Sequence, residues 1–121
     1  MLERFTMKSP KVKYHLTKSE SEALKKLSEF LKAEWPQAIL KLFGSKVTGT
    51  ADDESDIDLL IVLPAVINEN IRKRIIHSVF RTNLEYGSNI STLIVSRDEW
   101  VNGHLSVLPI HETIESEGVV L

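Results

Sequence analysis

The first third of the chain carries two different patterns of apolar and polar residues. Thr17 and Glu20 stand three residues apart, which is the spacing of a helix capping box. Behind them, apolar residues recur at the three- and four-residue steps of an amphipathic helix, at Ala23, Leu24, Leu27, Phe30 and Leu31. The pattern predicts a helix over residues 18–34 that ends before Pro36, followed by a strand over residues 38–43.

A second strand and a second helix follow a polar, turn-rich segment. Residues 57–63 are almost entirely apolar, which predicts a strand buried on both faces at the centre of a sheet. Asn68 is suited to cap a helix over residues 69–85, which ends at Gly87. The pattern places four apolar residues on the inner face of this helix, namely Ile71, Ile75, Val79 and Leu84. It places three basic residues largely on the opposite face, namely Arg72, Lys73 and Arg74.

The rest of the chain completes the element order. Residues 89–95 predict a third strand, Ser96 caps a turn that extends to Trp100, and Pro109 opens a last short helix up to Gly118. The order helix, strand, strand, helix, strand, helix predicts an α/β (α+β) fold. We expect a small mixed β-sheet flanked by helices.

Composition restricts the class of protein. The 121 residues are 42% hydrophobic with a net charge of −2, which indicates one globular domain and excludes a disordered chain. There is no cysteine, so disulfides, thiol chemistry and cysteine zinc sites are excluded. Every apolar run is far shorter than the roughly 20 residues of a spanning helix, and the N-terminus lacks the apolar core of a signal peptide. We therefore expect a cytoplasmic protein with no membrane contact.

Charge is distributed unevenly along the chain. Residues 1–50 hold ten Lys and Arg against five Asp and Glu, a net of +5, whereas residues 51–121 hold five against twelve, a net of −7. Residues 1–16 are basic and irregular, and we expect them to form a loose arm or a short edge strand ahead of a domain over residues 17–121. The small net charge argues against a dedicated nucleic-acid binder. Five acids within residues 52–58 indicate a cation site instead.

All specific chemistry lies in residues 42–62, and two common motifs fail there. A phosphate-binding P-loop is excluded because Thr and Ala follow Gly49, where that motif needs Lys and then Ser or Thr. A calcium-binding EF-hand loop starting at Asp52 is excluded because its required Gly and Glu positions hold Ile57 and Leu63.

The residue types in this segment indicate a different site. Gly44 and Ser45 end a strand and start a short helical turn, where a glycine backbone, a hydroxyl and free N–H groups form a phosphate cradle. Asp56 and Asp58 are two apart on a strand, so they point to one face while Ile57 points into the core. Two adjacent carboxylates repel unless a cation lies between them, which suits Mg²⁺. A phosphate cradle beside a magnesium site indicates a nucleoside-triphosphate site.

The segment resembles the signature of the DNA-polymerase-β-like nucleotidyltransferases, and the short length resembles their minimal branch in bacteria and archaea. The signature runs through Gly44, Ser45, Gly49, Ser55, Asp56 and Asp58. The element order extends the resemblance to roughly residues 30–121. It implies the nucleotidyltransferase fold.

The resemblance also implies a reaction. Asp56 and Asp58 would be the catalytic residues and would hold the Mg²⁺ ions that bridge the triphosphate of ATP, the expected donor. A hydroxyl would attack the α-phosphorus, so that AMP is transferred and pyrophosphate is released. The nucleotide would be bound by Gly44, Ser45, Lys46, Gly49 and Ser55.

One position departs from the family pattern. Active members carry a third carboxylate on a later strand, and here Ser91 occupies that possible third-ligand position. Asn89 is the other polar candidate on the same face, and the next acid, Asp98, comes after the strand. A neutral side chain binds Mg²⁺ weakly and is a poor base, so the pattern supports nucleotide binding better than catalysis.

The resemblance leaves two functions open. In the first, the acceptor hydroxyl belongs to a partner, expected to be a small all-helical protein of the HEPN type, with this chain as the antitoxin of a toxin–antitoxin pair. In the second, the chain is a catalytically degenerate nucleotidyltransferase that binds nucleotide and partner without turnover. The sequence leaves a homodimer open in both.

Overall fold

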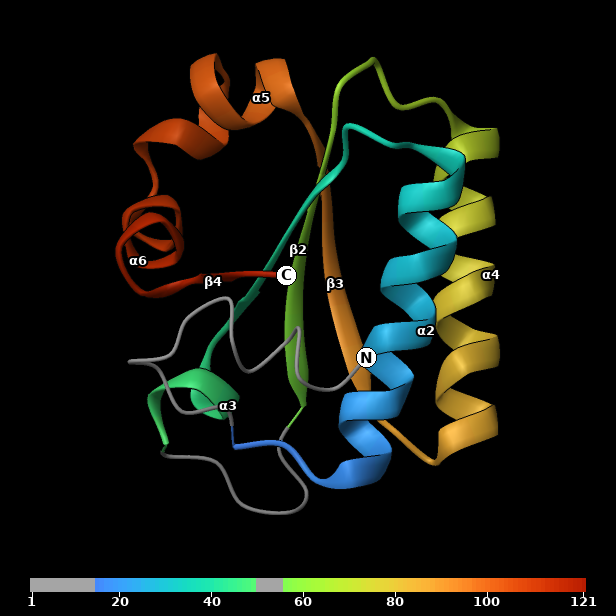
Figure 1. The fold of residues 1–121 in the computed structure, drawn as a ribbon. Helices are drawn as coiled ribbons and strands as arrows, with labels where there is room; N and C mark the ends of the chain where they lie inside the picture. Colours follow the sequence, from blue (N-terminus) through green and yellow to red (C-terminus); the bar gives the residue numbers. More distant parts are fainter. Residues whose placement is uncertain (1–14, 50–55) are drawn as a thin grey trace.

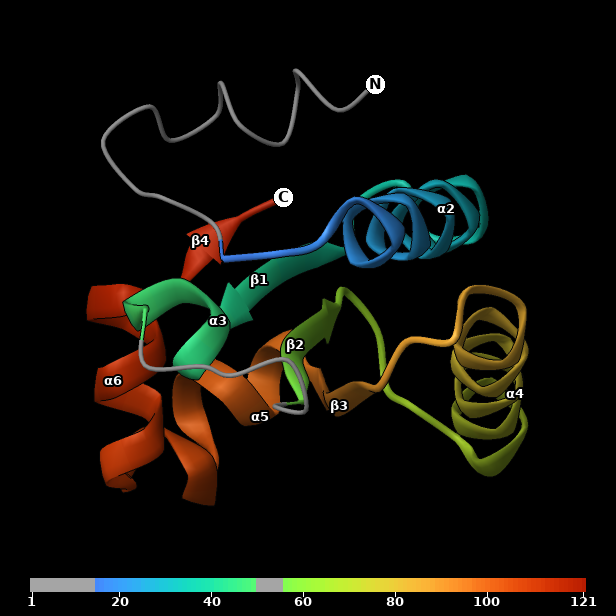
Figure 2. The same cartoon turned by 90° about the horizontal axis from the view of Figure 1, so that it is seen from below.

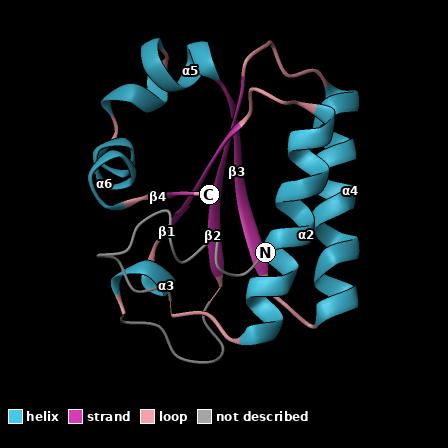
Figure 3. Cartoon of the chain, viewed as in Figure 1, coloured by secondary structure: helices cyan, strands magenta, loops and turns pink. Residues whose placement is uncertain are grey.

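A four-stranded mixed sheet forms the centre of the computed structural model, which describes residues 15–49 and 56–121 (Figure 1). Its strands are β1 (Ile39–Phe43), β2 (Ile57–Leu63), β3 (Ile90–Ser96) and β4 (Val119–Val120). They stand in the order β3-β2-β1-β4. β1 runs antiparallel to both of its neighbours, and β2 runs parallel to β3. The predicted mixed sheet flanked by helices is confirmed (Figure 3).

Strand β2 is central and buried on both faces, as its apolar run predicts. Its odd-numbered residues, Ile57 to Leu63, pack in one hydrophobic cluster with the helices of one layer. Leu60 and Val62 pack in a second cluster on the opposite face. The alternation follows from the two-residue period of a strand.

Two long helices cover the first face, α2 (Lys18–Glu34) and α4 (Glu69–Tyr86). They run antiparallel and side by side (Figures 1 and 2). Their bounds follow from local caps. The Thr17 and Glu20 capping box begins α2, the Asn68 side chain accepts a hydrogen bond from the first turn of α4, and Gly87 ends α4 in the left-handed conformation.

Three short helical segments cover the second face: α5 (Arg97–Asn102), the 3₁₀ helix η1 (His104–Val107) and α6 (Pro109–Glu117). Trp100 is buried there and donates a 2.8 Å hydrogen bond from Nε1 to Glu115 of α6. That bond, aided by Lys41 at 3.2 Å, holds the pKa of the Glu115 carboxyl below its ordinary value. Trp100 therefore anchors this layer.

One prediction about α4 is wrong. Leu84 was expected on the buried face, but it is 68% exposed, and Thr82 is buried in its place. The physical reason is helical phase: Thr82 follows the buried Val79 by three residues, whereas Leu84 follows it by five and turns away from the sheet.

Other differences are smaller. The third strand begins and ends one residue later than predicted, and β4 and η1 were not predicted at all. Residues 1–14 of the expected arm lie outside the described residues. Among the described residues, no helix combines the length and apolar composition needed to cross a bilayer.

Candidate active site

A short helical turn, α3 (Ser45–Thr48), leaves the end of β1 beside the start of β2. Gly44 opens it with a φ of 83°, a left-handed conformation that favours glycine. A Cβ atom at Gly44 would also overlap the carboxylate of Asp58. Glycine is therefore required at this position for both its conformation and its lack of a side chain.

The far end of α3 is fixed as well. Gly49 adopts a φ of 86°, and its N–H donates to the carbonyl of Ser45 at 3.0 Å. The backbone N–H of His15 donates to the carbonyl of Lys46 at 2.9 Å. The turn thus holds Gly44, Ser45, Lys46 and Gly49 together next to the acidic strand.

Asp58 is the second residue of β2 and lies between two neighbouring strands. It stands opposite Phe43 on β1 and opposite Ser91 on β3. Its side of β2 continues with Leu60, which packs against the α5 and α6 layer, so Asp58 opens onto that face of the sheet. Asp56 precedes the strand by one residue and is exposed, while Ile57 between them is fully buried in the other cluster.

The two carboxylates affect each other. Partial burial raises the pKa of Asp58 above its ordinary value, and the negative charge of Asp56 raises it further. A bound cation would remove this penalty. Two carboxylates beside a backbone that lacks a Cβ form an oxygen-rich donor set of the kind Mg²⁺ prefers. Over the described ranges, no group of three His, Cys, Asp or Glu side chains gathers for a metal ion.

Asn89, the residue just before β3, holds Asp56 of the acidic pair. Its side-chain amide donates a hydrogen bond to Oδ1 of Asp56, and its carbonyl accepts from the N–H of Ile57 at 2.9 Å. Asn83 of α4 holds the next residue, since its amide bonds both the N–H and the carbonyl of Ile90, at 2.9 and 3.1 Å. Asn89 therefore orients Asp56, a contact that the face pattern alone did not specify.

Lys46 lies differently from what its place in the sequence motif suggests. Its side chain is buried, and its ammonium group lies 3.1 Å from Oε2 of Glu20 on α2. Glu20 also accepts from the N–H of Thr17 at 2.9 Å, which is the capping-box bond. The sequence identified Glu20 only as a capping residue, because nothing local signals a contact across 26 residues.

The structure brings most of the expected residues together. Gly44 lies beside Asp58, the α3 turn that begins at Ser45 contacts β2, and Ser91 stands in register with Asp58. Ser55, the remaining member of the motif, lies outside the described residues, as do Asp52, Asp53 and Glu54.

Comparison with protein-family models identifies a family. The family model described as "Nucleotidyltransferase domain" matches residues 24–118, which include β1, β2, β3, α3 and both carboxylates. Searches of curated proteins and of solved structures find no significant match.

The ion pair between α2 and α3 predicts a stability effect. Glu20→Gln keeps an oxygen for the Thr17 cap but removes the charge facing the buried Lys46, so we expect it to lower the free energy of unfolding by about 1–3 kcal/mol. Urea denaturation measures this. Glu22→Gln, at an exposed position of the same helix, is the control. An equal effect of both substitutions would contradict the role of the ion pair.

The acidic pair predicts a gain in stability when one charge is removed. The pKa of Asp58 is raised in the folded state, so folding favours its protonated form, and that contribution is lost as pH rises through the folded pKa. Asp58→Asn should therefore stabilise the ligand-free protein at neutral pH by less than about 1 kcal/mol after solvent screening. The difference should vanish below pH about 4.

Thermal melts of wild type and Asp58→Asn across this pH range test the prediction. Glu29→Gln, an exposed acid on α2, serves as the control and should show no such trend. A lower melting temperature of Asp58→Asn at neutral pH would show that its charge stabilises the fold instead.

Proposed function

The chain belongs to the nucleotidyltransferase domain family, and from this membership we propose that it transfers AMP from ATP to a hydroxyl group of a partner protein. One observation carries the proposal: the backbone of Gly44 lies so close to the Asp58 carboxylate that a Cβ atom at position 44 would displace that carboxylate. A phosphate bound at the α3 turn would therefore lie beside the acidic pair.

Each residue of the site has a proposed task. Gly44 and Ser45 bind the β- and γ-phosphates through backbone N–H groups and a hydroxyl. Asp56 and Asp58 hold Mg²⁺, which supplies electrostatic stabilisation of the attacking and leaving oxygens when bound. The proposed nucleotide-binding set is completed by Gly49 and Ser55, whereas the ammonium group of Lys46, which the motif suggested as a further ligand, is buried against Glu20 and is left out of the set.

The transfer balances without a further reactant. The acceptor oxygen forms a bond to the α-phosphorus of ATP, the bond from that phosphorus to the bridging oxygen breaks, and pyrophosphate leaves. The hydroxyl proton passes to water, because Ser91 offers no carboxylate to accept it. Asn89 keeps Asp56 in its orientation throughout.

The proposed acceptor is a small helical protein of the HEPN type, with this chain as antitoxin. The support is the resemblance of the Gly-Ser and Asp-Ile-Asp motif to the minimal branch of the family, together with the family match over residues 24–118. The acceptor would be a tyrosine hydroxyl of the toxin.

Radiolabelled ATP tests the proposed transfer. Incubation with Mg²⁺, the helical protein encoded by the neighbouring gene and ATP labelled at the α-phosphate should place label on that protein. ATP labelled at the γ-phosphate should leave it unlabelled, since AMP and not phosphate is transferred. The double variant Asp56→Ala/Asp58→Ala should transfer nothing; equal labelling by wild type and this variant would refute the proposal.

A binding function without turnover is the second candidate, and Ser91 is the observation that favours it. Ser91 stands in register with Asp58 on the adjacent parallel strand, so the position next to the acidic pair carries a hydroxyl where active relatives are expected to carry an acid. Loss of one ligand of this kind costs several kcal/mol of transition-state stabilisation. A chain of this type would neutralise its partner by contact.

Ser91→Asp separates the two candidates. If the wild type already transfers AMP, the substitution changes the rate little. If it is a binding module, the wild type shows stabilisation by Mg²⁺-ATP, about 2.7 kcal/mol at 100 times the dissociation constant, but no transfer. Transfer should then appear only in Ser91→Asp. Thermal shift with and without a chelator, together with the labelling assay, provides both measurements.

A further inference from the structure

Helix α4 exposes a row of large apolar side chains on its outer side. Ile76, Phe80 and Leu84 follow one another at four-residue spacing and are 51%, 59% and 68% exposed. Residues at this spacing are neighbours on one side of a helix, so the three form a continuous apolar ridge. Single exposed apolar residues are ordinary on a protein surface, but an aligned row of this kind marks an interaction site.

A row of basic side chains runs beside the apolar ridge. Lys73, His77 and Arg81 also follow at four-residue spacing, and they line a groove of about 420 Å³ together with Phe30 of α2. Within residues 15–49 and 56–121, none of these three side chains forms a hydrogen bond or an ion pair. The groove therefore joins an aromatic side chain to unneutralised basic groups.

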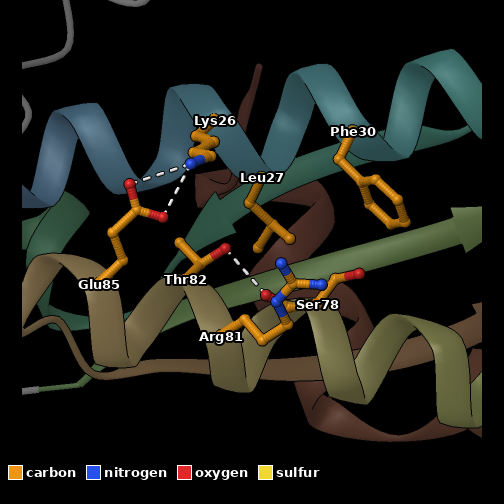
Figure 4. A pocket seen from close by; sticks show the side chains of 7 residues that line it. All are labelled: Lys26, Leu27, Phe30, Ser78, Arg81, Thr82 and Glu85. Atoms are coloured by element: carbon orange, nitrogen blue, oxygen red, sulfur yellow. Dashed lines mark hydrogen bonds and ion pairs between the residues drawn. The ribbon is translucent and has the colours of Figure 1, made fainter.

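Two acids beside this surface are already used. Glu85 binds Lys26 at 2.7 Å, and Glu34 binds Arg74. Figure 4 shows Glu85 directed toward Lys26, with Arg81 lying beside Ser78 instead. Glu69 lies exposed four residues before Lys73, but the residues that line the groove include no acid, so the groove itself stays basic.

We propose that this face of α4 docks an acidic amphipathic helix of a partner protein. The apolar side chains of that helix would pack against the ridge, and its carboxylates would pair with Lys73, His77 and Arg81. Rows at four-residue spacing pack into the grooves of a second helix. Paired charges beside an apolar centre give such a contact its specificity.

Other occupants fit the surface less well. The phosphates of a nucleic acid would pair with the basic row but leave Phe80 and Leu84 in water. A second copy placed face to face would bring two basic rows together. A membrane surface would cover the ridge but leave the groove under Phe30 unfilled.

The docking face is separate from the acidic pair. α4 packs on the face of the sheet that Ile57 faces, whereas Asp58 opens onto the α5 and α6 side. A docked helix would therefore leave the nucleotide site accessible. The proposal deepens the partner part of the proposed function and rests on it only for the identity of the acceptor, not for the binding itself.

Peptide binding tests the docking face without nucleotide. The probe is a fluorescent helical peptide of about 18 residues, five turns, built from Glu and Ala with Leu at every third or fourth position. Its control has Lys in place of every Glu. Fluorescence polarisation with the full chain should show preference for the acidic peptide, weakened by salt. Phe80→Ser should lower its affinity about 30-fold.

Two matched variants complete the experiment. Val107→Ser, at an 82% exposed position on η1, should bind the acidic peptide like the wild type. Lys73→Glu combined with Arg81→Glu should reverse the preference toward the basic peptide. Circular dichroism establishes that each variant is folded, so a loss of affinity reports on the surface.

Several results would overturn the proposal. These are no binding of the acidic peptide, equal affinity for both peptides, or wild-type affinity in Phe80→Ser. Binding to vesicles of equal parts phosphatidylserine and phosphatidylcholine that is lost in Phe80→Ser would assign the face to a membrane. A wild-type dimer that Phe80→Ser converts to a monomer would assign it to a second copy. Because ATP is absent, none of these results depends on whether AMP transfer occurs.

Discussion

The burial of strand β2 on both faces is the constraint on which the rest of the structure depends. Its apolar side chains require a helical layer on each side, and its backbone requires a strand on each edge, so it lies at the centre of the sheet. Asp58 is the one charged residue in that strand, and it occupies the second position, where the sheet opens to solvent. Because the preceding residue, Ile57, is fully buried, the strand cannot change its register to expose Asp58 further. The core therefore determines where the carboxylate lies.

The chemistry of the site follows from what surrounds that carboxylate. Asp56 raises the cost of its charge, the Gly44 backbone closes the space beside it, and Ser91 gives it a neutral neighbour on β3. Repulsion between two carboxylates prepares a site for a cation, and the absence of a third carboxylate at Ser91 limits how much charge the protein contributes to it. In the proposed function, cation binding and catalysis would therefore depend on different neighbours of Asp58.

The elements with local signals could be predicted from the sequence. The caps of α2 and α4 lie within a few residues of the helix ends, and the apolar run of β2 sets both its bounds and its central place. The acidic pair was visible because its spacing is also local. The bond from Asn89 to Asp56 and the ion pair between Lys46 and Glu20 join segments far apart in sequence, so no spacing specified them. Leu84 was assigned to the wrong face because it follows the buried Val79 by five residues, a step that still looks periodic in an apolar pattern. The residue that is buried there is Thr82, and its polar side chain gives no apolar signal.

Asn83 has a consequence for the solubility of the domain. β3 is an outer strand of the sheet, and an outer strand presents backbone groups to which another chain can add by edge-to-edge pairing, the first step of aggregation. The side-chain amide of Asn83 bonds both backbone groups of Ile90. Its oxygen accepts from the N–H and its nitrogen donates to the carbonyl, as a neighbouring peptide group would. One side chain thereby replaces the missing strand at this point and denies a second molecule the place where pairing would begin.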